Sequence, residues 1–270
     1  MRNDLRDWLD EKVEGERKPL YLSGGGELTV DLDGPALRVR QEDRAAMCYP
    51  LARVGRVISR GSVKWDSDAL LACAKTGIPV LFQLHDTEVC GFLFGWSASD
   101  DALFRALRTR LGRPGGGKVY LGWQRAMTEQ ALIVLAQQMP EMAGANSAED
   151  WRCRLGQCYQ RYVDAESYAA LTQRLRALLG ALSAQLLMEA GLDALRTGRV
   201  GVNLVGDLAG LLDWALQQPV LTALQGHRQK VAALNLADDR QLTRLFEAQA
   251  VDLRRLGQDL LGELQRRMAE

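Results

Sequence analysis

The chain has 270 residues, and its 34 lysines and arginines balance its 34 aspartates and glutamates, so the formal net charge at neutral pH is zero. This length is enough for one large domain or two ordinary ones, with ample apolar residues for a core. The balance excludes the strongly basic or acidic classes of protein, in which net charge alone predicts nucleic acid or a membrane surface as the partner.

Cysteine use and apolar content predict a soluble cytoplasmic protein. The five cysteines lack paired C-x-x-C spacing and lie among apolar neighbours, which is typical of buried thiols in a reducing compartment. The chain begins with MRNDLRDWLDEK, which is charged from its second residue, so we expect no signal peptide. The most apolar window, residues 177–195, contains Ser183, Gln185 and Glu189, and we interpret it as a buried helix rather than a membrane span.

The positive residues are mostly arginines, 28 against six lysines. Guanidinium groups suit phosphate contacts better than ammonium groups do. A GC-rich genome, which encodes arginine in preference to lysine, explains the same bias more simply.

The N-terminal part has the short alternating apolar runs and turn segments of a β-rich domain, over residues 19–95. Within it, residues 66–77 predict one helix, which Asp66 or Ser67 caps and Gly77 ends. A buried strand, IPVLFQL, follows, and EVCGFLFGW is expected to pair with it as a hairpin. The other expected strands lie at residues 19–23, 27–32, 36–40 and 46–51, with two more between residues 54 and 65.

The segment from residue 102 to residue 128 contains six positive residues and no acidic one. At its centre is GRPGGGK, which predicts a flexible basic linker over residues 101–122. It lacks a phosphate-loop pattern, because Val119 occupies the Ser/Thr position. A linker near a DNA-binding surface would gain counterion-release energy on phosphates; a plain solvated linker is the alternative.

The remainder of the chain, residues 123–270, predicts an all-α domain. Together with a β-rich domain at residues 1–100, it indicates an α+β fold. The expected helices cover residues 123–139, 148–164, 167–190 and 207–218, followed by a long amphipathic tail from residue 237 to the C-terminus.

Metal-dependent nucleic-acid chemistry needs clustered carboxylates, often with a histidine, around a hard cation. The helical domain has several carboxylates, but Asp213 follows Asp207 by six residues and lies on a different helix face. The positions that share a face with Asp207 are Gly210 and Leu211, and neither can bind a metal.

The two histidines, His85 and His227, lie far from these carboxylates in sequence. We expect His85 in a hairpin turn and His227 at a helix end, where a cation is favourable. No Ser-His-Asp arrangement or Gly-x-Ser-x-Gly elbow is present. From its residues alone, the chain is a soluble two-part protein with a modest bias toward nucleic acid.

Two stretches of the N-terminal half resemble a known family. PLYLSGGG at residues 19–26 reads as an opening strand, and residues 49–82 contain a strand, a turn, a capped helix and a second strand in that order. Both stretches are similar to the Cas1 family of CRISPR adaptation integrases, and the resemblance extends over roughly residues 19–220. It implies an N-terminal β domain followed by an all-α domain that holds a metal site.

The family's catalytic set is a glutamate, a histidine after a Gly-Leu-rich turn, and an aspartate beginning the next helix, with a second acid one turn later. Glu149 matches the glutamate, and Asp207 matches the aspartate at the end of GLDALRTGRVGVNLVGDLAG. Arg196 stands where the histidine belongs, and Gly210 where the second acid belongs. The resemblance therefore implies a remnant of a catalytic site, with Glu149 and Asp207 as a weak site for Mg²⁺ or Mn²⁺.

Arg196 changes the chemistry of this remnant. A guanidinium is always charged and has no lone pair, so it can neither bind a cation nor shuttle a proton. We hypothesise that Arg196 replaces the metal by pairing with Asp207, Glu149 or both; the alternative is that it points to solvent. A shift of the alignment by one or two residues would bring in Asp193 or Glu189 but no histidine.

The resemblance implies a protein of CRISPR adaptation, that is, spacer acquisition in antiviral defence. It also implies a homodimer formed through the β domain, a possible Cas2 partner and bound double-stranded DNA. We expect a DNA-binding or scaffolding member with a degraded, catalytically impaired centre. An active metal-dependent endonuclease or integrase with unusual ligands, and a protein-interaction subunit without DNA binding, are the alternatives. The expected DNA contacts are Arg108, Arg110, Arg113, Lys118, Arg196 and Arg199.

Overall fold

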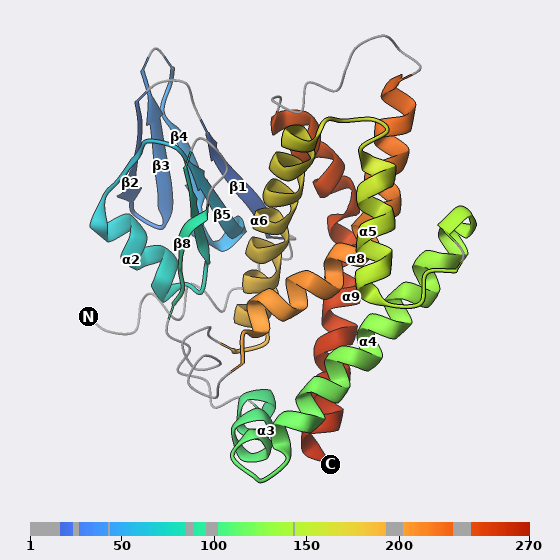
Figure 1. Ribbon diagram of the computed structural model, residues 1–270. Helices are drawn as coiled ribbons and strands as arrows, with labels where there is room; N and C mark the ends of the chain where they lie inside the picture. The colour runs from blue at the N-terminus through green and yellow to red at the C-terminus, as the bar shows by residue number, and fades with distance from the viewer. Residues whose placement is uncertain are drawn as a thin grey trace. The chain divides into compact units, whose positions relative to one another are not determined.

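The computed structural model confirms an α+β protein with strands in its N-terminal part and helices in its C-terminal part (Figure 1). It forms two compact units, Met1–Ala98 and Ser99–Glu270. None of the helices in the described part of the chain combines the length and apolarity that a membrane span requires. The structure describes residues 17–23, 27–42, 44–84, 89–95, 102–142, 144–192, 202–228 and 239–270.

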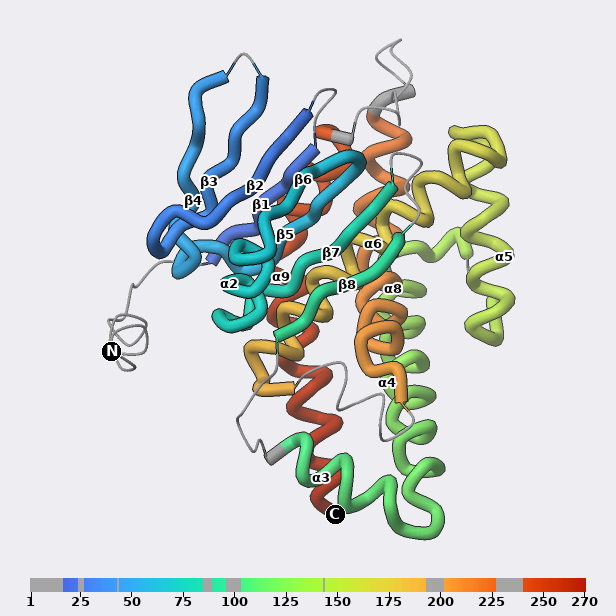
Figure 2. The backbone as a smooth tube through the Cα atoms, turned by 90° about the vertical axis from the view of Figure 1, so that its left-hand side faces the viewer, coloured from blue at the N-terminus to red at the C-terminus, as the bar shows by residue number. Residues whose placement is uncertain are grey.

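The N-terminal unit contains two four-stranded sheets, with strand orders β1-β5-β7-β8 and β4-β3-β2-β6 (Figure 2). In the first sheet β1, β5 and β7 are parallel, and β7 and β8 form the antiparallel hairpin that the sequence predicts. The strands are β1 (Lys18–Ser23), β2 (Leu28–Asp33), β3 (Ala36–Gln41), β4 (Met47–Pro50), β5 (Val54–Arg60), β6 (Val63–Trp65), β7 (Val80–Gln83) and β8 (Val89–Leu93).

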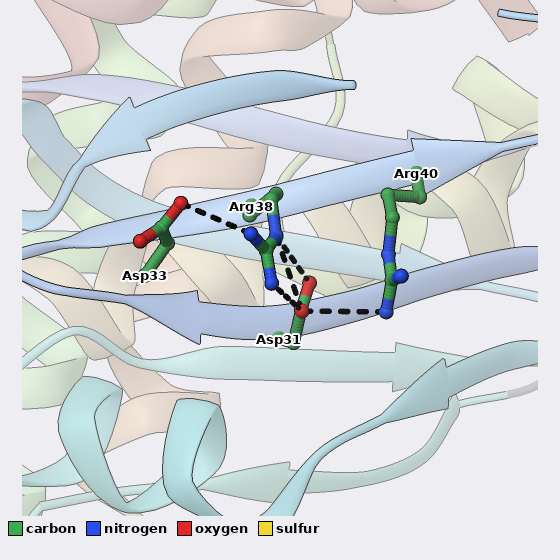
Figure 3. Close-up of polar contacts among 4 residues, drawn as sticks. All are labelled: Asp31, Asp33, Arg38 and Arg40. Atoms are coloured by element: carbon green, nitrogen blue, oxygen red, sulfur yellow. Dashed lines mark hydrogen bonds and ion pairs between the residues drawn. The ribbon is translucent and has the colours of Figure 1, made fainter. Parts of the chain in front are cut away.

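Strands β2 and β3 show how the alternation of apolar and polar residues gives each strand a buried face and a polar face. Side chains on successive strand residues point to opposite faces, and Val30 and Val39, which are paired across the hairpin, are both buried in the core. On the other face Arg38 donates to Asp31 at 2.6 Å and to Asp33 at 3.2 Å (Figure 3). The hydrogen bond from Arg38 lowers the pKa of Asp31, so this carboxylate stays charged. On the polar face, the charges of the two aspartates are therefore balanced by those of Arg38 and Arg40.

Helix α2 (Ser67–Lys75) lies in the crossover between the parallel strands β5 and β7. It buries Ala69 and Cys73 in the core of this unit. Asp66 stands at the N-cap position without a side-chain hydrogen bond to the helix, whereas Gly77 ends the helix with φ of 71°. A left-handed residue is the usual way to terminate a helix, and glycine adopts it without steric cost.

The C-terminal unit is helical and is built around α6 (Ala165–Glu189). All residues from Ala177 to Leu187 are buried, and α6 packs against both α8 (Leu204–Arg228) and α9 (Asp239–Ala269). Gly257 of α9 allows a close crossing, because a Cβ there would lie 2.4 Å from Leu186 Cδ1. The other helices of the described residues are α3 (Ala102–Leu111), α4 (Gly116–Gln138) and α5 (Ala148–Tyr159), with short 3-10 turns at Leu51–Arg53 and Pro140–Met142.

The predicted flexible linker over residues 101–122 is wrong. Helix α3 covers most of its first half, and α4 begins at Gly116, inside the glycine run. Gly115 precedes α4 with φ of 82°, and Gly116 lies so close to the Arg110 carbonyl that a Cβ would be 1.9 Å from it. The glycines therefore make a tight helix–helix turn. Burial of apolar side chains from both helices explains why this segment is ordered, since Leu107 and Trp123 are fully buried.

Candidate functional site

The carboxylate of Asp207 is the centre of the candidate site, in the first turn of α8. Asn203 organises this helix start, because its side chain accepts a hydrogen bond from the Gly206 backbone N–H at 3.1 Å and its carbonyl accepts from that of Asp207 at 2.9 Å. A carboxylate in the first turn of a helix is stabilised by the unpaired N–H groups and the helix dipole. The aspartate is half-buried, so one side of the carboxylate faces protein.

Tyr120 of α4 is the protein partner of that carboxylate. Its hydroxyl donates to Asp207 Oδ2 at 2.6 Å, a length typical of a charge-assisted O–H···O⁻ bond. Tyr120 is buried, and its ring lies 5.5 Å from that of Trp123. Burial raises the pKa of Tyr120, and the hydrogen bond to Asp207 raises it further. The phenol therefore stays protonated at neutral pH and remains a donor to Asp207.

Glu149, the match to the family's glutamate, lies in the first turn of α5 and is exposed. Among the described residues it has no hydrogen-bond or ion-pair partner. The neighbouring contacts are structural: Ser147 caps α5 by accepting from the Asp150 backbone at 3.1 Å, and Arg154 pairs with Asp150 at 3.4 Å. Arg154 also donates to the carbonyl of Gly144 at 3.2 Å, which ties the incoming loop to the helix.

Gly210 lies on α8 one turn after Asp207. A Cβ built at this position meets no heavy atom within 4 Å, so the space for a side chain is open. The glycine is thus not required by packing, and the missing acid at this position is a property of the sequence rather than of crowding.

Several predicted residues lie outside the described residues. These include Arg196, Arg199 and Asp193, so the hypothesis that Arg196 pairs with Asp207 or Glu149 stays a prediction. His85 is also outside the described residues, and so is the side chain of His227.

The donor set in the described part of the chain does not fit a divalent cation. No group of three or more His, Cys, Asp or Glu side chains converges within the described ranges. Asp207 already accepts the Tyr120 hydrogen bond, and Gly210 supplies no ligand atom. Mg²⁺ and Mn²⁺ prefer several oxygen ligands in near-octahedral geometry, and the described side chains around Asp207 do not supply them.

Four of the six predicted DNA-contact residues lie at the turn between α3 and α4, and the other two are outside the described residues. Arg108 and Arg110 lie in the last turn of α3, Arg113 lies in the connecting turn, and Lys118 lies at the start of α4. Arg108, Arg113 and Lys118 are exposed, whereas Arg110 is half-buried. The tight glycine turn therefore gathers positive side chains that the sequence spreads over eleven positions.

Sequence reasoning missed a second polar site, because it set Asp213 aside as a residue on a different helix face from Asp207. Asp213 lines a cavity of about 120 Å³ between α5, α6 and α8, together with Arg152, Arg176, Tyr159 and Gln217. Burial raises the pKa of Asp213, while the charges of Arg152 and Arg176 lower it. The sequence signal in α8 was a pair of polar residues four positions apart, Asp213 and Gln217, in a mostly apolar helix.

The comparisons with known proteins agree with this architecture. Residues 20–114 match the family model described as CRISPR associated protein Cas1. A CAS1 protein from Thermotoga maritima has the same fold, with a TM-score of 0.75 at 15% identity over 93% of this chain and 97% of that one. A TtCas1–DNA complex gives 0.61 at 15% identity, with 92% of each chain covered.

A third solved structure is a Cas6-RT-Cas1–Cas2 complex. It matches with a TM-score of 0.57 at 11% identity, over 94% of this chain and 35% of the longer chain in that complex. A comparison with curated protein sequences finds no match. At these identities the solved structures show the fold alone, while the family model rests on sequence.

A strand unit followed by a helical unit is thus the architecture that this chain shares with the solved Cas1 structures. The sequence match to the Cas1 family model covers residues 20–114, and the fold shared with the solved Cas1 structures extends over almost the whole chain. That family is generally metal-dependent.

Proposed function

We propose that this chain acts in CRISPR adaptation as a DNA-binding or scaffolding member whose metal site is degraded. One observation carries the proposal: the carboxylate at the family's aspartate position accepts a 2.6 Å hydrogen bond from Tyr120. A metal ligand must direct a lone pair at the ion, and a buried phenol that competes for Asp207 lowers its availability. Gly210 adds no second carboxylate one turn later.

DNA binding is supported by the turn between α3 and α4. Its exposed positive side chains, Arg108, Arg113 and Lys118, belong to a segment without a single acidic residue from 102 to 128. Such a surface neutralises phosphates and releases counterions, so affinity falls steeply as salt rises. The Cas1 protein of similar fold in a DNA complex is consistent with this role.

The assembly that we propose is a homodimer formed through the N-terminal β unit, which joins a Cas2 partner. A complex that contains both Cas1 and Cas2 includes a chain with this fold, and that likeness supports the partner. Analytical ultracentrifugation of the chain alone and with Cas2 tests both parts. A strictly monomeric chain that does not sediment with Cas2 would remove this part of the proposal.

Three measurements on one preparation test the function. Isothermal titration with Mn²⁺ is expected to give weak or no binding, and strand transfer on branched DNA is expected to give no product. Binding of duplex DNA is expected at low salt and should fall steeply between 50 and 200 mM salt, as for proteins that contact several phosphates. Robust metal-dependent strand transfer that Asp207→Ala abolishes would show an active enzyme with unusual ligands. Absence of DNA binding at low salt would favour a protein-interaction subunit.

A further inference from the structure

The cavity between α5, α6 and α8 has the chemistry of a ligand site. We call it the arginine pocket and define it by Arg152, Arg176, Asp213, Tyr159 and Gln217. Its volume of about 120 Å³ is well above the roughly 10–15 Å³ that holds one water. A tetrahedral oxyanion with part of its hydration shell therefore fits.

The inner wall of the pocket is fixed by hydrogen bonds. Tyr159 is buried, and its hydroxyl donates to Gln217 Oε1 at 3.1 Å, while Gln217 Nε2 donates to the Asp213 carbonyl at 3.1 Å. These bonds join α5 to α8 and hold one turn of α8 in place. Asp213 thus lies on a rigid surface, which is the condition for a specific polar site.

The two arginines remain available to a ligand. Arg152 and Arg176 are exposed, and neither forms an ion pair within 4.0 Å with any residue that the structure describes. Their charges act on Asp213 through space rather than through a direct salt bridge. Two guanidinium groups around one carboxylate leave an excess of positive charge at the mouth of the pocket.

The aromatic rings of the pocket are already engaged, which argues against a stacked base as the ligand. Arg152 lies over the ring of Trp214, 5.2 Å from its centroid, and the rings of Tyr159 and Tyr168 lie 5.2 Å apart. Trp214 is also buried. The free recognition groups are therefore guanidinium donors, and these form bidentate hydrogen bonds with phosphate oxygens.

We propose that the arginine pocket binds a terminal phosphate monoester, held by Arg152 and Arg176. The pocket is lined by side chains of three helices. A terminal phosphate monoester carries more negative charge than a diester of the duplex backbone, so it pairs better with two guanidinium groups. The same chemistry comes from two sources: the 5′-phosphate of a DNA strand, or a free nucleotide. The DNA source rests on the proposed DNA-binding function, whereas the phosphate site itself does not.

The test compares matched ligands on the full chain. Duplexes that differ only in carrying a 5′-phosphate or a 5′-hydroxyl are compared by fluorescence anisotropy, and a deoxynucleoside 5′-monophosphate is titrated by ³¹P NMR. We expect the phosphorylated end to bind about tenfold more tightly, as a hydrogen bond to a charged group allows. Arg152→Gln and Arg176→Gln should each remove this preference, while Arg255→Gln, at an exposed position on α9, should keep it.

Asp213→Asn separates a phosphate site from a merely structural role. Removing the negative charge beside the arginines should strengthen phosphate binding by several-fold, whereas a purely structural loss would weaken it. Circular dichroism establishes that each variant is folded.

The outcomes distinguish the two proposals. Equal affinity for both duplex ends, together with no saturable signal from the monophosphate, would overturn the pocket while leaving DNA binding intact. Binding of the monophosphate that depends on the arginines, without any binding of hydroxyl-ended duplex, would support the pocket and remove the proposed DNA-binding function.

Discussion

Replacement of Tyr120 by phenylalanine removes one oxygen and leaves the ring in its buried position. The lost contact is the 2.6 Å hydrogen bond to Asp207, which joins α4 to α8. Hydrogen bonds to charged groups contribute about 1.5–3 kcal/mol. Asp207 is half-buried, so water can replace the phenol on its exposed side, and the cost should be near the lower end, about 1.5 kcal/mol. For a helical unit of this size, that corresponds to a fall in Tm of about 3–6 °C.

The assay is differential scanning calorimetry, with the transition of the helical unit followed in parallel by circular dichroism. Tyr168→Phe is the matched control, because its ring contact with Tyr159 is retained and we expect a Tm close to that of the wild type. A Tyr120→Phe protein as stable as the control would show that the phenol does not hold Asp207, and the central observation behind the proposed function would fall. A second readout is Mn²⁺ titration, in which Tyr120→Phe should bind the ion no less tightly than the wild type.

Three further predictions concern packing, pH and the open position on α8. Gly257→Ala should lower the free energy of unfolding by about 1–2 kcal/mol in urea denaturation, since the new methyl meets Leu186. Gly262→Ala, on the same helix but at a position with open space, should raise the free energy of unfolding by about 0.5–1 kcal/mol. If Gly257→Ala were the more stable of the two variants, α9 would not cross α6 closely at Gly257. The pKa of Tyr120 is raised on folding, so the folded state holds the phenol proton more tightly than the unfolded state does. The free energy of unfolding in urea should therefore fall as the pH rises above about 10, and it should fall less in Tyr120→Phe. Gly210→Glu should fold normally by circular dichroism, because the space around position 210 is open. In a titration, Mn²⁺ binding should appear only when Gly210→Glu is combined with Tyr120→Phe. Tight binding by Gly210→Glu alone would show that Tyr120 does not block the site.

Much of the secondary structure was predictable because local periodicity carries it. The alternation in ELTVDL and ALRVR predicted two strands that pair residue for residue, with Val30 opposite Val39. The expected helix over residues 66–77 was found at Ser67–Lys75, ended by Gly77 as predicted. In each case, the side chains that determine the element lie within a few residues of one another.

The glycine run at residues 115–117, which follows Pro114, shows where local reasoning failed. Glycine and proline predicted a flexible linker, since they disfavour a helix interior. The structure uses the same glycines to make a left-handed turn and a close backbone approach, at Gly115 and Gly116. Burial of Leu107 and Trp123 outweighs the low helix propensity of the glycines and the proline. That burial depends on tertiary packing, so the sequence near the glycines does not predict it.

The sequence by itself determined the order of the two units, the family resemblance and the position of Asp207 at a helix start. It also determined what is missing, because a glycine at position 210 cannot supply a ligand whatever the fold. Only the tertiary structure decided what Asp207 contacts, since Tyr120 lies 87 residues earlier in the chain. The arginine pocket likewise combines three helices, and Asp213 gains its character from burial and from guanidinium charges on two other helices. Electrostatic environment depends on distances in space, and those are set by packing rather than by spacing along the chain.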